Sequence, residues 1–193
     1  MQKSESYNGS AINALLNTYL EEFGIESTPQ VLDDLKKHFM NAFFETGLSL
    51  SPGIDKLFAH LRANDIPMAI ATDGSEKEVQ ALCKAINGFD SSLFSHMVCG
   101  ERNPEVVNNK PAPDIYLVCA NKFAEPPKSP QNCVIFEDSL KGIRGAVASG
   151  MKTVLINDSL DSDYDSLRPY ITGIIGSFED FRPESVGLPP YPL

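Results

Sequence analysis

Short apolar runs alternate with helix-like stretches through the second half of this chain. The runs are 66–71 (IPMAIA), 133–136 (CVIF) and 152–156 (KTVLI). The first of them is short and continuously apolar, which is typical of strands that helices cover on both faces. Stretches such as 139–150 (SLKGIRGAVASG) separate them and have helical periodicity. Strands joined by crossover helices form right-handed βαβ units, so the sequence predicts an α/β fold with a doubly wound parallel sheet.

The same alternation predicts four further elements. Helices are expected at 75–86 and 112–123, and strands near 96–99 and at 173–177.

The first 50 residues contain amphipathic helices without strands. One helix is predicted at 10–24, between an N-cap at Ser10 and a stop at Gly24, and a second follows the Thr28-Pro29 start signal. A third helix is expected after Ser51-Pro52. We therefore expect a small helical subdomain over 1–50 and an α/β core over 51–193.

The charge of the chain excludes one class of partner. The formal net charge is −10 and no Lys- or Arg-rich run is present, whereas a nucleic-acid surface needs clustered cations. No window approaches 18 apolar residues, and the N-terminal residues lack the apolar region of a signal peptide, so neither a membrane span nor secretion is expected.

The cysteines indicate a reducing compartment. They have no C-x-x-C spacing and lie in apolar stretches, which favours buried free thiols over disulfides or zinc ligands. A cytoplasmic protein is therefore predicted. The four positions are Cys83, Cys99, Cys119 and Cys133.

Polar residues follow two of the predicted strands. Thr72 and Asp73 come directly after the first apolar run, and Glu137 and Asp138 come directly after CVIF. Lys110 lies between them in the sequence, in a loop immediately before a helix. Ligands of open parallel sheets bind at the carboxyl ends of the strands, so these residues are the candidate site.

Each part of this set also has a simple structural interpretation. Thr72 and Ser75 are suited to capping the next helix, Lys110 to carrying a solvated charge, and Ser139 to capping the helix after a solvated strand end. Together, however, the parts fit phosphate chemistry. A hydroxyl at a helix start and a lysine can bind phosphate oxygens, and a carboxylate pair suits Mg²⁺.

The order of these motifs resembles one family. IATDGS, NKPAPDIY and VIFEDSLKG resemble the second, third and fourth motifs of the haloacid dehalogenase superfamily of phosphohydrolases. From about Leu48 onward the chain is similar to the pseudouridine-5′-phosphatase subgroup, including the ending SFEDFRPESVGLPPYP. The early helices match only as a helical cap of the kind that this family carries.

The resemblance implies a fold and a reaction. It implies a Rossmann-like core with a partial helical cap, and Mg²⁺-dependent hydrolysis of a small phosphomonoester through an aspartyl-phosphate. Thr72 and the adjacent Asp73 would lie at the phosphoryl group, Lys110 would pair with the nucleophile and the phosphate, and Glu137 and Asp138 would hold Mg²⁺. Asp73 departs from the subgroup, which usually has Ser there. A carboxylate beside a phosphate is repulsive unless it points away or meets the cation.

One part of the family pattern is missing from the sequence. Its first motif is a strand that ends in Asp-x-Asp, where the first Asp is the nucleophile, and no such strand precedes the helices. The Asp-x-Asp patterns formed by Asp161, Asp163 and Asp165 lie in a polar stretch that is interpreted as an acidic surface loop. The family's first strand would lie between MAIAT and VIFED, so its loss is expected to leave backbone groups unpaired.

Three hypotheses follow from this pattern. The chain is an N-terminally truncated phosphatase impaired by loss of the nucleophile, or a non-catalytic phosphate- and Mg²⁺-binding pseudoenzyme or regulatory partner, or an unrelated α/β domain. Under the first we expect little or no phosphatase activity. We also expect marginal stability because the central strand is missing.

Overall fold

The computed structural model describes residues 16, 18, 20–45, 48–100, 103–157 and 162–192. The chain divides into two compact units, one of Met1–Ser49 with Ala85–Asn87 and the other of Leu50–Lys84 with Gly88–Leu193. Over the described residues, every helix is too short or too polar to cross a membrane.

The first unit contains one long helix and a short parallel ladder. The helix α2 (Pro29–Glu45) begins at the predicted signal, where the Thr28 hydroxyl accepts the Val31 amide at 3.3 Å. The strands β1 (Leu48–Ser49) and β3 (Ile86–Asn87) pair in parallel. Most of the helix predicted at 10–24 lies outside the described residues.

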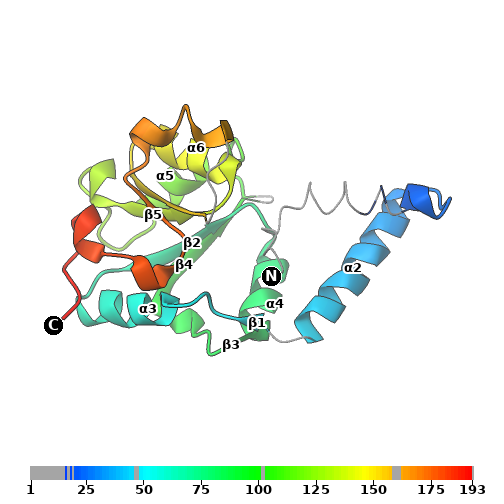
Figure 1. The fold of residues 1–193 in the computed structure, drawn as a ribbon, viewed down its shortest axis with the longest axis horizontal. Coiled ribbons are helices and arrows are strands. Elements are labelled where there is room, and N and C mark those ends of the chain that lie inside the picture. The colour runs from blue at the N-terminus through cyan, green and yellow to red at the C-terminus, as the bar shows by residue number, and fades with distance from the viewer. Residues whose placement is uncertain are drawn as a thin grey trace. The chain divides into compact units, whose positions relative to one another are not determined.

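The second unit alternates strands and helices as predicted (Figure 1). Its strands are β2 (Met68–Thr72), β4 (Phe94–Cys99), β5 (Val134–Glu137), β6 (Lys152–Ile156) and β7 (Gly173–Ile175). The helices are α3 (Ile54–Ala63), α4 (Glu76–Ala85, whose last residue belongs to the first unit), α5 (Asp114–Asn121) and α6 (Leu140–Ala148). Short 3₁₀ turns lie at Ser91–Leu93, Pro130–Asn132, Ser162–Tyr164, Arg168–Tyr170, Phe178–Asp180 and Pro183–Val186.

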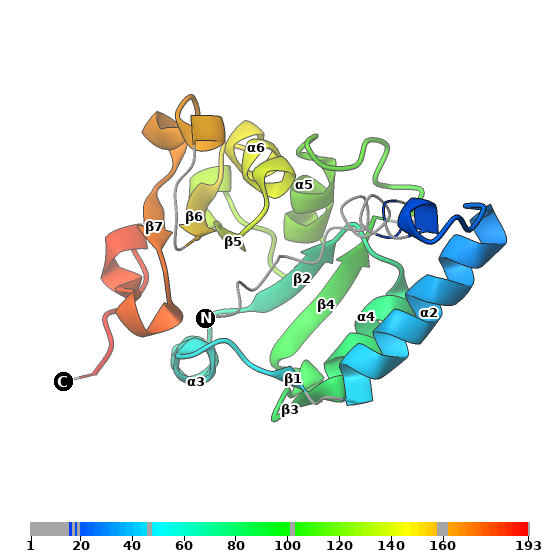
Figure 2. The same ribbon diagram turned by 45° about the vertical axis from the view of Figure 1, so that its right-hand side comes forward.

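The strands of the second unit form two separate parallel sheets. One has the order β2-β4 and the other the order β5-β6-β7. Figure 2 shows β2 and β5 as the neighbouring members of the two sheets. Among the described strands no ladder joins β2 to β5, so each has one edge without strand pairing.

Two apolar clusters cover the strands from opposite faces, and both clusters include residues of β2 and of β5. On the face of α5 and α6, Ala69 and Ile135 pack against a buried cluster that includes Ile115. On the face of α3, Met68 and Phe136 pack with the second cluster. Helices on both faces therefore hold the two sheets together although their backbones are not paired (Figure 2).

Candidate phosphate site at the strand ends

The end of β2 leads directly into a capped helix. The Thr72 hydroxyl accepts the Gly74 amide at 3.2 Å. Ser75 and Glu78 then form a capping box, because the Ser75 amide donates to Glu78 at 2.9 Å and the Glu78 amide donates to the Ser75 hydroxyl at 3.3 Å. The N-terminus of α4 is therefore fixed next to Thr72, whose hydroxyl can still donate its own hydrogen to a ligand.

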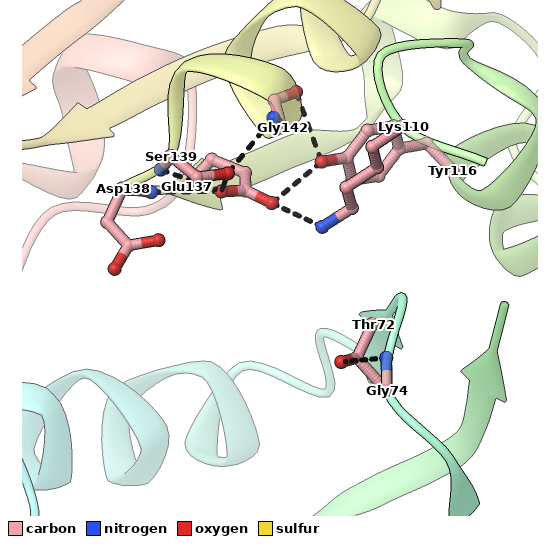
Figure 3. Close-up of polar contacts among 8 residues, drawn as sticks. All are labelled: Thr72, Gly74, Lys110, Tyr116, Glu137, Asp138, Ser139 and Gly142. Carbon is pink, nitrogen blue, oxygen red and sulfur yellow. Dashed lines mark hydrogen bonds and ion pairs between the residues drawn. The ribbon is translucent and has the colours of Figure 1, made fainter. Parts of the chain in front are cut away.

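Lys110 lies in a loop that is tied to the start of α5. The Asn108 amide donates to the Asp114 carboxylate at 2.9 Å, and the Ala112 amide donates to the Asn109 carbonyl at 3.0 Å. The Lys110–Pro111 peptide bond is cis. Lys110 Nζ donates to Glu137 Oε1 and lies 5.0 Å from the centre of the Tyr116 ring (Figure 3).

Glu137, the last residue of β5, has both carboxylate oxygens occupied. Oε1 accepts from Lys110 and from the Tyr116 hydroxyl, the latter at 2.9 Å. Oε2 accepts the Asp138 amide at 3.0 Å and the Ser139 amide and hydroxyl at 3.1 Å each. Burial by itself would raise the pKa of Glu137, but the Lys110 charge and these hydrogen bonds outweigh it and hold the pKa below its usual range. Glu137 is therefore a buried anion with all its oxygens paired.

The first turn of α6 is shaped around this carboxylate. Ser139 is the N-cap, and its hydroxyl accepts the Gly142 amide at 3.0 Å. A side-chain carbon at Gly142 would overlap the Glu137 carboxylate. The absence of a side chain at this position lets the helix approach the buried charge.

Asp138 differs from its neighbour. It is exposed, and Figure 3 shows its carboxylate pointing away from that of Glu137. Although the residue is exposed, the protein around its carboxylate displaces part of the hydration, and this loss of hydration and then the charge of Glu137 raise the pKa of Asp138 above its usual range. Of the two carboxylates, Asp138 is the one that is open to a ligand from outside.

The β2 and β5 ends share one electrostatic environment. The pKa of Tyr116 is raised by burial first and then by Glu137, and the charges of Asp73 and Asp138 add to the increase. Asp73 and Asn109 also meet at Gly100, where an added side-chain carbon would stand 3.4 Å from Asp73 Oδ1 and 3.0 Å from Asn109 Oδ1. The ends of β2, β4 and β5 and the Lys110 loop therefore lie at the same edge.

The fit of a magnesium ion differs between the two acidic residues. Mg²⁺ in phosphate sites is commonly held by one or two carboxylates together with water and phosphate oxygens. Asp138 fits this description because it is exposed and its carboxylate points away from that of Glu137. Glu137 does not fit without rearrangement, because its carboxylate already accepts five hydrogen bonds. Within the described ranges, no cluster of three or more His, Cys, Asp and Glu side chains is placed to hold a metal ion.

The predicted residues fall into two groups at this edge. Lys110 and Glu137 are in direct contact, whereas Figure 3 shows Thr72 with its Gly74 partner apart from them, with no bond between the groups. Asp73 is exposed beside Thr72.

Sequence reasoning did not identify Tyr116 and Gly142 as members of the site. The available signals were a tyrosine six residues after Lys110 and a glycine three residues after the Ser139 cap. Both are also common as core and packing residues in helices.

The acidic stretch after β6 contains two described aspartates, Asp163 and Asp165. Asp163 is within the 3₁₀ turn Ser162–Tyr164, and Asp165 accepts an ion pair from Arg168 at 2.9 Å. Both are exposed, and Asp161 lies outside the described residues.

The chain has clear relatives among curated proteins. A 142-residue match with 42% identity links it to the "Probable pseudouridine-5′-phosphatase" of Drosophila melanogaster and covers 74% of this chain and 60% of that protein. The chain is also 34% identical over 192 residues to (DL)-glycerol-3-phosphatase 2 of Arabidopsis thaliana, a match that covers 98% of this chain and 77% of the relative. The chain thus spans 60% of the length of the fruit-fly relative.

Solved structures have the same fold. CbbY from Rhodobacter sphaeroides in complex with phosphate matches with a TM-score of 0.64 and 26% identity, over 81% of this chain and 67% of that one. A family model for haloacid dehalogenase-like hydrolases matches residues 4–150, which is well over half of the chain. These findings confirm the resemblance inferred from the three motifs, and the chain belongs to the haloacid dehalogenase-like hydrolases.

Proposed function

We propose that this chain carries the phosphate-binding part of a phosphohydrolase that acts on a small phosphomonoester similar to pseudouridine 5′-phosphate. The observation that carries the proposal is the Lys110 ammonium, which Glu137 anchors at the edge where Thr72 and the start of α4 also lie. The names of the fruit-fly and Arabidopsis relatives support a small phosphorylated substrate.

Each group at this edge has a defined task toward a phosphate. The Thr72 hydroxyl donates to one phosphate oxygen, and the backbone amides at the start of α4 add favourable dipoles. Lys110 offsets part of the negative charge. A magnesium ion held by Asp138 would supply further charge neutralisation when bound. Asp73 then favours ligands whose phosphate approaches from the Lys110 side, because two anions in close contact repel.

Hydrolysis by the family's covalent route also needs a nucleophilic carboxylate. None of the described strands ends in Asp-x-Asp. We propose that such a carboxylate would arrive on a strand that pairs with the open edges of β2 and β5, and that the 193-residue chain alone turns over substrate slowly or not at all. The four free cysteines support a cytoplasmic location.

A comparison of two proteins tests this proposal. The chain as it stands is assayed beside a version extended at its N-terminus by an apolar strand that ends in Asp-x-Asp, using a panel of phosphomonoesters with Mg²⁺. The control extension ends in Asn-x-Asn. We expect turnover only with the Asp-x-Asp extension.

The other outcomes have separate meanings. Robust turnover by the unextended chain would contradict the proposed lack of a nucleophile. Mg²⁺-dependent binding of phosphate without turnover by either protein would favour the alternative of a non-catalytic phosphate-binding protein.

A further inference from the structure

We propose that Tyr116 and Glu137 are positioning residues that hold the Lys110 ammonium at the phosphate edge. This inference rests on the proposed function for its consequence, which is phosphate affinity, but its geometry is independent of that function. The three side chains come from three different segments, namely the loop before α5, α5 itself and the end of β5.

Glu137 holds Lys110 through a contact that is largely shielded from water. The side chains of Lys110 and Glu137 are 10% and 9% exposed, respectively. A carboxylate has about four lone-pair sites, and five donors surround this one. Glu137 has no spare acceptor position, so a cation that bound it directly would displace Lys110 or a backbone amide.

Tyr116 touches both members of the ion pair. Its hydroxyl lies 2.9 Å from Glu137 Oε1 and 3.1 Å from the Gly142 carbonyl oxygen, and its ring lies under the Lys110 ammonium at 5.0 Å. The aromatic face attracts the cation while the hydroxyl fixes the carboxylate oxygen that receives it. The phenol is 4% exposed, which limits its alternative rotamers.

The packing of α6 constrains the positions of the Lys110 loop and of Tyr116. An added side-chain carbon at Gly145 would stand 2.8 Å from the Ala112 carbonyl oxygen and 3.1 Å from a carbon of the Tyr116 ring. The Lys110 loop and α5 therefore lie directly against α6. A lysine has a long flexible side chain, and fixing it before the ligand arrives removes an ordering cost from phosphate binding.

The first test measures how strongly Lys110 is held in its contacts, and it needs neither phosphate nor activity. The 193-residue chain is trace-labelled with acetic anhydride at neutral pH, and the acetylation rate of each lysine is obtained by mass spectrometry. Tyr116→Phe keeps the ring and removes only the hydroxyl. We expect it to raise the labelling rate of Lys110 several-fold, and Glu137→Gln to raise it by about tenfold or more, as expected for loss of a charge-assisted hydrogen bond.

Matched controls separate this effect from general loosening of the fold. Tyr170→Phe removes the hydroxyl of a tyrosine that is 66% exposed, and Glu105→Gln removes the partner that Lys122 contacts at 2.6 Å. Neither should change the labelling of Lys110, and Glu105→Gln should raise labelling at Lys122 alone. An unchanged Lys110 rate in both Tyr116→Phe and Glu137→Gln would overturn the inference.

Titration with inorganic phosphate then tests whether the position of Lys110 affects phosphate affinity. If the wild-type chain binds phosphate, Tyr116→Phe is expected to weaken the affinity and Tyr170→Phe to leave it unchanged. If the wild type binds no phosphate, the proposed function fails while the labelling result still decides the positioning inference. If the wild type and Tyr116→Phe bind equally well, the positioning inference fails while the proposed function stands.

Discussion

Lys110 Nζ donates directly to Glu137 Oε1, and both side chains are about nine-tenths removed from solvent. Two buried charges cost desolvation energy, which their attraction and further hydrogen bonds must offset. Here the backbone amides of Asp138 and Ser139 and the Tyr116 hydroxyl supply those bonds. The strand that ends in two carboxylates is thus tolerated because the first of them is fully paired and the second is exposed.

Breaking this pair is expected to destabilise the protein in a pH-dependent way. Glu137→Gln should lower the free energy of unfolding by about 3 kcal/mol at neutral pH, because it leaves Lys110 buried without its anion. The folded-state pKa of Glu137 lies below its ordinary value of 4.5. Its stabilising contribution is therefore present above that ordinary value and is lost as the pH falls toward the folded-state pKa.

Urea unfolding at neutral pH and at about pH 4 measures this effect. The difference in stability between wild type and Glu137→Gln should shrink at the lower pH. As a control, Glu105→Gln at the more exposed Lys122 pair should cost less than about 1 kcal/mol at either pH. A Glu137→Gln protein as stable as wild type at neutral pH would contradict the account of the pair.

Ionisation of Asp138 is predicted to lower the stability of the fold, whereas ionisation of Glu137 raises it. Its pKa is raised in the folded state, so its ionisation opposes folding as the pH rises through its ordinary range. Asp138→Asn should therefore raise the urea midpoint slightly at neutral pH. The same variant should lose any enhancement by Mg²⁺ of phosphate binding in calorimetric titration, and an enhancement equal to that of the wild type would contradict the role of Asp138.

Gly142 should not tolerate a side chain. In Gly142→Ala the new methyl group would occupy the space of the Glu137 carboxylate, and we expect a loss of about 2–3 kcal/mol by chemical denaturation. Gly173→Ala is the matched control, since its new carbon would stand 3.8 Å from Val154, an ordinary contact distance. If both substitutions have the same small effect, the close packing of α6 on Glu137 is not as described.

The open edges of β2 and β5 predict a marginally stable core. Their facing backbone groups have no ladder partner among the described strands, and unpaired backbone groups in a protein interior cost free energy. We expect the chain to melt below about 60 °C in calorimetry, whereas a cooperative transition above that temperature would be high for a mesophilic domain with such a gap. The Asp-x-Asp-extended chain should melt at a higher temperature.

The elements of the α/β unit could be predicted because their signals are local. The run at 152–156 was predicted as a strand and forms β6, whose three central residues are buried. Thr28 and Ser139 are at the helix starts where they were expected. The ladder between Leu48–Ser49 and Ile86–Asn87 was not predicted, because two-residue strands have no periodicity and 75–86 continues a helical pattern up to this point.

The site was only partly predictable for a different reason. Strand-end positions identified Thr72, Lys110 and the acidic pair, since any parallel sheet brings such residues to one edge. Glu137 pairs with Lys110, whereas the Asp138 carboxylate points away from that of Glu137. This difference depends on side-chain direction, which the order of two adjacent residues does not reveal. Tyr116 was missed because a buried aromatic in a helix also satisfies a hydrophobic core, to which it does belong.

The most direct test of the central claim is calorimetric titration of inorganic phosphate into the wild-type chain, Lys110→Met and Glu105→Gln, with Mg²⁺ present. We predict saturable binding by the wild type and by Glu105→Gln, and an affinity at least about tenfold weaker for Lys110→Met, as expected for loss of one charge-assisted contact. Equal affinities for wild type and Lys110→Met would contradict the claim that the Lys110 edge is the phosphate site.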